Sequence, residues 1–487
     1  MFAIIICMTG NGKRAIIIGS GISGFSAGIN LLLNGFDVSI YEKNPFYGGC
    51  CGAFEENEMI FDHCIHWMIG TLPNSKENKM WSKIHAFDDV DSIYNSPFLS
   101  SFVYEGQTLH IHKDYKKNID EWVNVSIKDR KAIIKLNKQF KHAYNFFASR
   151  NIFKRLPFLF NIIKGLFHSR ADIAKKFKHP GLKALISTCQ NGKCCWTFFL
   201  FEYGHFMNGN AGIPEGGSRK VIDNIKTYYE KLGGKLFLNS PVSKINIENK
   251  IVKSIEVNGK KIAGDYFISA CAPEHTLKTL LNSKYEHCGI TKLRKREGKY
   301  KTPSFLQINF LCSGDTSNIP ISCGFLLEKP LKVGSSEMNY VFIRTYNYDE
   351  KLYLRNNKIP LVVFVDQYKE DFKFFENLSH EKYEEEKRHI SEMIMKEIET
   401  RYPHLKNKLS YISMITPLSF EETFNSPNGA YMGFPIPKGG MFKLLSPKIK
   451  GINNLYLASN WLITPGGTPF ANISGTRASK QIIKKCK

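Results

Sequence analysis

The stretch RAIIIGSGISGFSAGINLLLNGFDVSIYE, residues 14–42, decides the fold. It opens with a short β-branched block that predicts a buried parallel strand, followed by a G-x-G-x-x-G turn at 19–24. Residues 25–34 carry apolar side chains at helical spacing, and residues 36–41 predict a second strand that ends at Glu42. Strand, glycine turn, helix, strand and acid in this order predict a dinucleotide-binding βαβ unit.

Each residue type in this unit has a physical reason. Gly19 permits the tight turn, Gly21 lets the backbone approach a pyrophosphate, and Gly24 lets the helix pack closely on the strand. The helix N-terminus offers free N–H groups and a favourable dipole to the phosphates, and Glu42 can accept hydrogen bonds from ribose hydroxyls. The predicted cofactor contacts in this unit are Gly19, Ser20, Gly21, Ser23, Gly24, Glu42 and Lys43.

The residues after Glu42 narrow the choice of cofactor. Residues 42–54 read EKNPFYGGCCGAF and residues 60–70 read IFDHCIHWMIG. Here the chain resembles the FAD-dependent phytoene desaturase, carotenoid isomerase and retinol saturase family of the amine oxidase superfamily, and its motifs are most similar to those of retinol saturases. The resemblance implies that the backbone of Gly48, Gly49 and Cys50 lies beside the FAD pyrophosphate. It also makes His66 the candidate for a catalytic polar group near the flavin, against the alternative of a histidine that only bonds backbone.

Two later blocks carry the same resemblance. Residues 212–220, GIPEGGSRK, are similar to the family's turn that opens a helix, and the strands expected after it imply an adenine contact by the Val242 backbone. Residues 454–475, NLYLASNWLITPGGTPFANISG, resemble the C-terminal FAD segment, in which a helix N-terminus lies beside the isoalloxazine. This implies contacts from Asn460, Asn472 and Ile473, although Asn460 stands where the family commonly has aspartate.

Because the three nucleotide blocks are far apart, the FAD domain must be discontinuous. We predict an α/β, Rossmann-like domain of the glutathione reductase type, with an α+β substrate domain. The FAD domain is assigned residues 8–75, 205–285 and 445–487, and the substrate domain residues 76–204 and 286–444. Strand-like runs within 303–366 suit a mixed or antiparallel substrate sheet, whereas 380–401 reads as a solvated helix. No second G-x-G-x-x-G occurs, so a separate NAD(P) domain is not predicted.

The net charge is unevenly distributed. The 487 residues carry 67 Lys+Arg against 44 Asp+Glu, a net charge of +23, and residues 130–183 contain fourteen Lys/Arg, nine Phe/Tyr and one acid, Asp172. Interleaved cations and aromatics favour a surface that meets an anionic membrane. A helical cap over the substrate cavity is an equally good interpretation. Nucleic-acid binding is disfavoured, because no recognition motif accompanies the charge.

Twelve cysteines at irregular spacings do not suggest a disulfide framework, and no metal-site spacing is present. A reduced, cytoplasmic compartment is expected, with peripheral membrane association as an open alternative. Residues 1–7 are apolar but too short for a secretory signal, and translation can also start at Met8. No run approaches the ~20 apolar residues of a spanning helix.

A flavin site beside an aromatic-rich substrate domain implies hydride transfer to or from a hydrophobic molecule. By resemblance, the substrate is a polyene or other lipid, and the reaction saturates, desaturates or isomerises a carbon–carbon double bond. Two alternatives stay open: an amine oxidase-like flavoprotein, and a lipid-binding protein whose FAD is structural. Tyr203, His205 and Tyr431 are further candidates for polar groups in the cavity.

Overall fold

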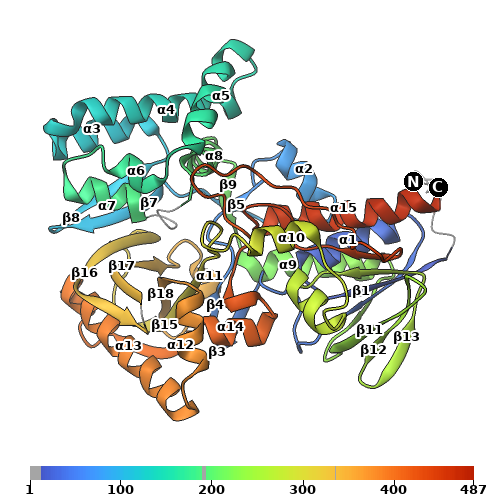
Figure 1. The fold of residues 1–487 in the computed structure, drawn as a ribbon. Coiled ribbons are helices and arrows are strands. Elements are labelled where there is room, and N and C mark those ends of the chain that lie inside the picture. The colour runs from blue at the N-terminus through green and yellow to red at the C-terminus, as the bar shows by residue number, and fades with distance from the viewer. Residues whose placement is uncertain (1–11, 189–193, 335) are drawn as a thin grey trace.

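The computed structural model describes residues 12–188, 194–334 and 336–487. The alternative start at Met8 lies outside the described residues. The chain folds around two large sheets, with a group of helices capping one of them (Figure 1).

The first large sheet has five parallel strands in the order β10-β2-β1-β14-β20. Its strands are β1 (Arg14–Ile18), β2 (Asp37–Tyr41), β10 (Lys235–Phe237), β14 (Tyr266–Ser269) and β20 (Leu455–Leu457). They come from the start, middle and end of the chain, because each of the three nucleotide blocks supplies at least one strand. The predicted Rossmann-like fold is confirmed.

Helices α1 (Ile22–Leu32), α9 (Gly217–Lys231) and α15 (Thr468–Cys486) pack beside this sheet. The α1–α15 contact is close, because a Cβ at Gly475 would lie 2.2 Å from the Ser23 carbonyl oxygen. Helix α2 (Lys76–Ser82) also joins this core through Trp81. Residues just after 75 therefore share the core of the nucleotide-binding part, although the sequence-based division assigns them to the substrate part. The domain boundaries as a whole stay a prediction.

Smaller sheets connect the nucleotide-binding part to its surroundings. An antiparallel meander follows β10, and a two-stranded and a three-stranded sheet lie beside α9 and the glycine turns. The meander consists of β11 (Val242–Glu248), β12 (Ile251–Val257) and β13 (Lys260–Ala263). The others are β3 (Ala53–Glu56) with β4 (Met59–Asp62), and β5 (Met68–Ile69) with β9 (Ala211–Pro214) and β6 (Ile93–Tyr94).

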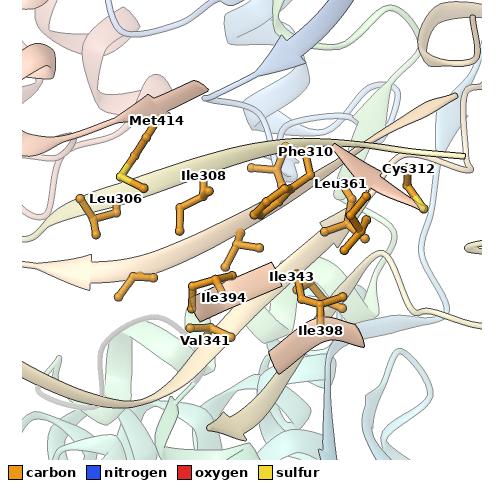
Figure 2. Close-up of a cluster of buried hydrophobic side chains, with 14 of the residues drawn as sticks. Leu306, Ile308, Phe310, Cys312, Val341, Ile343, Leu361, Ile394, Ile398 and Met414 are labelled. Atoms are coloured by element: carbon orange, nitrogen blue, oxygen red, sulfur yellow. The ribbon is translucent and has the colours of Figure 1, made fainter. Parts of the chain in front are cut away.

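The second large sheet has seven strands in the order β19-β15-β18-β17-β16-β7-β8. All neighbours are antiparallel except β16 and β7, so the sheet is mixed. Its strands are β7 (Phe98–Tyr104), β8 (Gln107–His112), β15 (Ser304–Cys312), β16 (Ser322–Val333), β17 (Ser336–Thr345), β18 (Ile359–Gln367) and β19 (Leu409–Ile415). Figure 2 shows how one face of this sheet packs its aliphatic side chains against Ile394 and Ile398 of α13 (His380–Arg401).

The opposite face of this second sheet lies below a helical cap (Figure 1). The cap helices are α3 (Tyr115–Val125), α4 (Arg130–Ala148), α5 (Ile152–Leu166), α6 (Arg170–Ala174), α7 (Pro180–Thr188) and α8 (Trp196–Met207). Short helices fill the remaining connections: α10 (Cys288–Arg294), α11 (Glu350–Tyr353), α12 (Lys369–Glu376) and α14 (Pro417–Phe424). Within the described ranges, no helix combines the length and apolar character needed to cross a bilayer.

Candidate functional site

The glycine turn brings the start of α1 to the carboxyl end of β1. Gly19 has a φ of +97°, and a Cβ at Gly24 would lie 2.1 Å from the Gly19 carbonyl oxygen. Neither position accepts a side chain without moving backbone. Gly21 forms a bridge with Gly48 of the second glycine pair, so the two glycine segments lie side by side at the N-terminus of α1.

Glu42 is the buried acid at the end of β2, with 6% of its surface exposed. One carboxylate oxygen, Oε2, accepts hydrogen bonds from the Ser20 N–H (2.9 Å) and the Ser20 hydroxyl (2.8 Å). The other, Oε1, accepts from the Asn44 N–H at 3.0 Å. Both oxygens are thus held by protein donors, and the carboxylate still lines the large cavity that contains the glycine turn.

The second glycine pair and the following cysteines lie beside this turn. Gly48 donates its N–H to the Ser20 carbonyl oxygen at 3.1 Å. Burial raises the pKa of the Cys50 thiol to about 12, so this thiol stays protonated at neutral pH. Cys50 and Cys51 are both free thiols. The pair contributes small apolar side chains to the site and forms no bridge.

The N-terminus of α15 reaches the same space from the other end of the chain. The helix follows a Gly466-Gly467 loop, and the residues of its first turn, from Thr468 to Ala471, line the cavity. An unpaired helix N-terminus favours negative charge, as expected beside a flavin. Asn460 also lines this wall.

One continuous cavity of about 740 Å³ joins these elements to the seven-stranded sheet and the cap. Most of the predicted site residues line it: Gly19, Gly21, Ser23, Glu42, Lys43, Gly48, Gly49, Cys50, His66, Val242 and Asn460. Beyond them the wall becomes aromatic and aliphatic. That second half is lined by Phe98, Leu99, Phe198, Phe206, Phe305, Phe342 and Phe364.

Four predicted cofactor residues lie outside the cavity wall. Ser20 and Gly24 support the turn from behind, and Ile473 packs into an apolar core. Asn472 is 1% exposed, accepts a hydrogen bond from the Ser26 hydroxyl at 2.9 Å and donates to the Met80 carbonyl at 3.3 Å. Its side chain joins α15 to α1 and α2, because it lies on the face of α15 that packs on α1. The side chain therefore does not line the cavity, and a cofactor contact at Asn472 stays a prediction.

His66 lies where the cofactor end of the cavity meets the substrate sheet. Its ring packs edge-on against Phe364, with centroids 4.8 Å apart. Burial, the positive charge of Arg344 and His63 lower the pKa of His66 well below 6.5. The imidazole is therefore neutral at neutral pH, with one ring nitrogen able to donate and the other to accept. Of the three other polar candidates, Tyr431 lines the cavity, whereas Tyr203 and His205 do not.

Glu202 of α8 is a cavity residue that was not among the sequence-based candidates. It is 4% exposed, and burial raises its pKa to about 8 against the opposing positive charge of Arg170. Asp366 and Tyr431 line the same cavity. The sequence does contain a signal for Glu202, because it is the only acid in the largely apolar and aromatic run WTFFLFEYGHFM, residues 196–207. A buried proton-carrying group in a cavity is typical of functional sites.

We expect Glu202→Gln to change how stability depends on pH. Folded Glu202 keeps its proton up to about pH 8, whereas the unfolded chain releases it near 4.5, so wild-type stability falls as pH rises between these values. The variant lacks this loss. Its free energy of unfolding relative to wild type should rise by roughly 2–4 kcal/mol between about pH 5 and pH 8. Chemical denaturation at both pH values measures this, with the exposed Glu248→Gln as control, and an unchanged difference would contradict it.

The residues present fit FAD. The two glycine segments pack closely at the N-terminus of α1, where a Cβ at Gly49 would lie 3.2 Å from the Gly21 Cα. Without side chains there, the backbone N–H groups stay accessible to a pyrophosphate. Glu42 is held in place for ribose hydroxyls by Ser20 and Asn44, and Val242 lines the same cavity. The Lys43 ammonium makes a structural contact: it donates to the Glu422 carbonyl oxygen at 2.6 Å and so connects the end of β2 to α14.

Comparison with known proteins agrees with this geometry. The family model for flavin containing amine oxidoreductase matches residues 22–483. Prolycopene isomerase 1, chloroplastic, of an Oncidium hybrid cultivar is 23% identical over 499 residues, which cover 96% of this chain and 83% of that protein. All-trans-retinol 13,14-reductase of Danio rerio is 23% identical over 526 residues, covering 93% and 83%.

Among solved structures, an oxidoreductase from Methanosarcina mazei superposes with a TM-score of 0.59 at 14% identity, covering 97% of this chain and all of that one. This likeness shows the fold, while the family model spans nearly the whole sequence and includes the glycine turn's helix and the C-terminal segment. The cofactor is FAD. The chain belongs to the flavin-containing amine oxidoreductase family and is an FAD-dependent oxidoreductase.

Proposed function

We propose that the protein acts on a carbon–carbon double bond of an apolar polyene lipid. The observation that carries this proposal is the cavity itself, which begins at the cofactor residues and continues into a wall of phenylalanine and leucine side chains. A long apolar molecule can fill that wall with little loss of hydrogen bonding. The curated relatives named above are a prolycopene isomerase and a retinol reductase, which supports this substrate class.

FAD, when bound, supplies hydride transfer through its N5 atom. The chain's own residues do the rest. Phe342 and Phe364 hold an apolar substrate against the sheet and exclude water. Neutral His66 can donate or accept a hydrogen bond beside Phe364. Glu202, protonated below about pH 8, can hold a proton at the cap side of the cavity.

The substrate class is tested with the purified yellow holoprotein under anaerobic conditions. After dithionite bleaches the flavin, a polyene such as all-trans-retinol should restore its visible absorbance, or the oxidised protein should be bleached by a polyene. Bleaching by a primary amine with no response to any polyene would overturn the proposal in favour of an amine oxidase. No flavin response to either class, together with unchanged chromatographic retention of the polyene, would indicate structural FAD.

We further propose that the protein docks on an anionic membrane. Helix α5 exposes a row of large apolar side chains along one face, with exposures from 39% to 77%. The row consists of Ile152, Phe153, Leu156, Leu159, Phe160, Ile163 and, just after the helix, Phe167. Helix α5 projects from the cap (Figure 1). Exposed Lys154 and Lys164 on the same helix are suited to anionic headgroups.

A second exposed apolar segment connects this helix to the cavity. Met441, Phe442 and Leu444 are 53–63% exposed, and the nearby Gly439 N–H donates to the Leu166 carbonyl at the end of α5. Phe442 packs against Phe470, a cavity-lining residue. These contacts support a membrane-facing surface that adjoins the cavity wall, through which a lipid can enter without crossing water.

We expect Phe160→Asp to weaken binding to vesicles of phosphatidylcholine with phosphatidylserine by about 10-fold, because it removes one large apolar contact and adds a negative charge. Flotation of the holoprotein with vesicles measures the bound fraction. Ile251→Asp changes an exposed apolar residue on β12, away from α5, and should leave binding unchanged. Wild-type protein that stays unbound to vesicles both with and without phosphatidylserine would contradict the membrane proposal.

A further inference from the structure

Arg344 of β17 places a guanidinium in the wall of the cavity. It is 4% exposed. Its Nη atoms donate to the carbonyl oxygens of Ile65 and His66 and to the Tyr348 hydroxyl, all at 3.3–3.4 Å. Its buried Nε–H has no hydrogen-bond partner. Across the described ranges, no carboxylate oxygen lies within 4.0 Å of this guanidinium.

A buried charge without a close counter-ion is unfavourable, and arginine does not lose its proton in proteins. Asp62 contributes a negative charge nearby. Its oxygens, however, accept hydrogen bonds from the N–H groups of Cys64 and Ser218 and from the Ser218 hydroxyl. Hydrogen bonds from a guanidinium to a carboxylate span about 2.7–2.9 Å. Arg344 instead donates to neutral oxygens at 3.3–3.4 Å. The geometry leaves room for a stronger anionic partner in the cavity.

Two serines lie in line with Arg344 on the next two strands of the sheet, β16 and β7. Ser322 of β16 pairs directly with Arg344, and the Cys323–Ser101 pairing of β16 with β7 places Ser100 next to Ser322. Ser100, Ser322 and Arg344 line the cavity on the cap-facing side of the sheet. Ser100 is 2% exposed, and its hydroxyl is buried with no hydrogen-bond partner. Neighbouring strands lie about 4.8 Å apart, so one head group above Ser322 can reach all three side chains.

With increasing distance from Arg344, the side chains on this face of the sheet are first aromatic and then acidic. Phe342 lies two residues before Arg344 on the same side of β17 and pairs with Phe364 of β18, and both line the cavity. Two residues further along β18 lies Asp366, which accepts a hydrogen bond from the Tyr340 hydroxyl at 3.2 Å. Cation, aromatic pair and acid therefore succeed one another over roughly 13 Å. This polarity orients an amphipathic anion with its head at Arg344 and its chain over the phenylalanines.

We propose that Arg344, Ser100 and Ser322 form a subsite for the carboxylate head group of an otherwise apolar, unsaturated chain. This rests on the proposed function and narrows its substrate class from polyene lipids to polyene acids. Arginine suits the role because its planar fork matches a carboxylate, and the serine hydroxyls can donate to the same oxygens. The head group anchors the chain so that its double bonds lie along the aromatic wall.

The proposal is tested by titrating the holoprotein with cis-parinaric acid and, separately, with its methyl ester, following the fluorescence of the polyene. The two probes share a chain and differ in the head-group charge. Wild-type protein should bind the acid roughly 10- to 100-fold more tightly than the ester. Arg344→Met should lose this preference while keeping its affinity for the ester, Arg344→Lys should keep part of it, and Ser100→Ala should reduce it severalfold.

FAD content and the midpoint of thermal unfolding, measured for each variant, show whether it folds. If Arg344→Met does not fold, the acid-over-ester preference of Ser100→Ala and Arg344→Lys still tests the subsite, because neither variant removes the buried charge. Equal affinity of wild-type protein for acid and ester would overturn the subsite. So would an unchanged acid preference in Arg344→Met with a lowered flavin midpoint potential, which would assign the guanidinium to the cofactor. Redox turnover of polyenes is scored separately, so the proposed function and the subsite can fail independently.

Discussion

Replacing Gly24 with alanine is expected to yield protein without FAD. The added Cβ would lie 2.1 Å from the Gly19 carbonyl oxygen and 3.4 Å from the Ala270 Cβ, so the turn that begins α1 must open. We expect the free energy of unfolding to fall by roughly 3 kcal/mol, as for other overpacked sites. The ratio of flavin to protein absorbance and chemical denaturation measure the two effects.

Gly298→Ala is the matched control, because its added Cβ meets no atom within 4 Å. It should retain both the cofactor and wild-type stability. A Gly24→Ala protein with one FAD per chain and unchanged stability would show that the turn does not need this close approach, and the proposed pyrophosphate site would then be wrong.

Glu42→Gln is expected to weaken FAD binding by roughly 100-fold. Both oxygens of the Glu42 carboxylate accept backbone N–H groups, from Ser20 and from Asn44. A glutamine amide has only one oxygen, so its NH₂ group must face one of these donors and the side chain turns away. The acceptor for the ribose hydroxyls is lost with it. Equilibrium titration of the apoprotein with FAD measures the dissociation constant.

Glu55→Gln provides the control for this change. Glu55 is an exposed carboxylate on β3 that pairs with Arg219 at the surface. Its neutralisation should leave FAD affinity unchanged. Wild-type affinity in Glu42→Gln would remove Glu42 from the cofactor site.

The nucleotide-binding fold was predictable because its signals are local. The glycine turn, the helix stop at Gly35 and the acid after β2 each follow from neighbouring residues, and the structure places them as expected. For Asn472 the motif supplied a position along the chain but no side-chain orientation, and the structure shows this side chain packed between α15, α1 and α2. An α-helix turns about 100° per residue, so a side chain one or two positions away faces a different neighbour.

The substrate half was less accessible from sequence. Arg344 and Ser100 lie more than two hundred residues apart, and only the register of β7, β16 and β17 brings them to one wall. Glu202 could have been found as a single acid in an apolar helix. The sequence offered two interpretations of residues 130–183, a helical cap and a membrane-facing surface. In the structure, α4, α6 and α7 contribute to the core of the cap, whereas α5 leaves a row of apolar side chains exposed.

Mass spectrometry of lipids after anaerobic incubation with the holoprotein tests the proposed polyene chemistry most directly. Reduced holoprotein that saturates its substrate should add two hydrogens to a polyene lipid as the flavin is reoxidised, and oxidised holoprotein that desaturates it should remove two. An isomerase leaves the mass unchanged and shifts the chromatographic retention only when FAD is bound. If no polyene lipid changes in mass or retention, while a primary amine bleaches the flavin, the proposed chemistry is wrong.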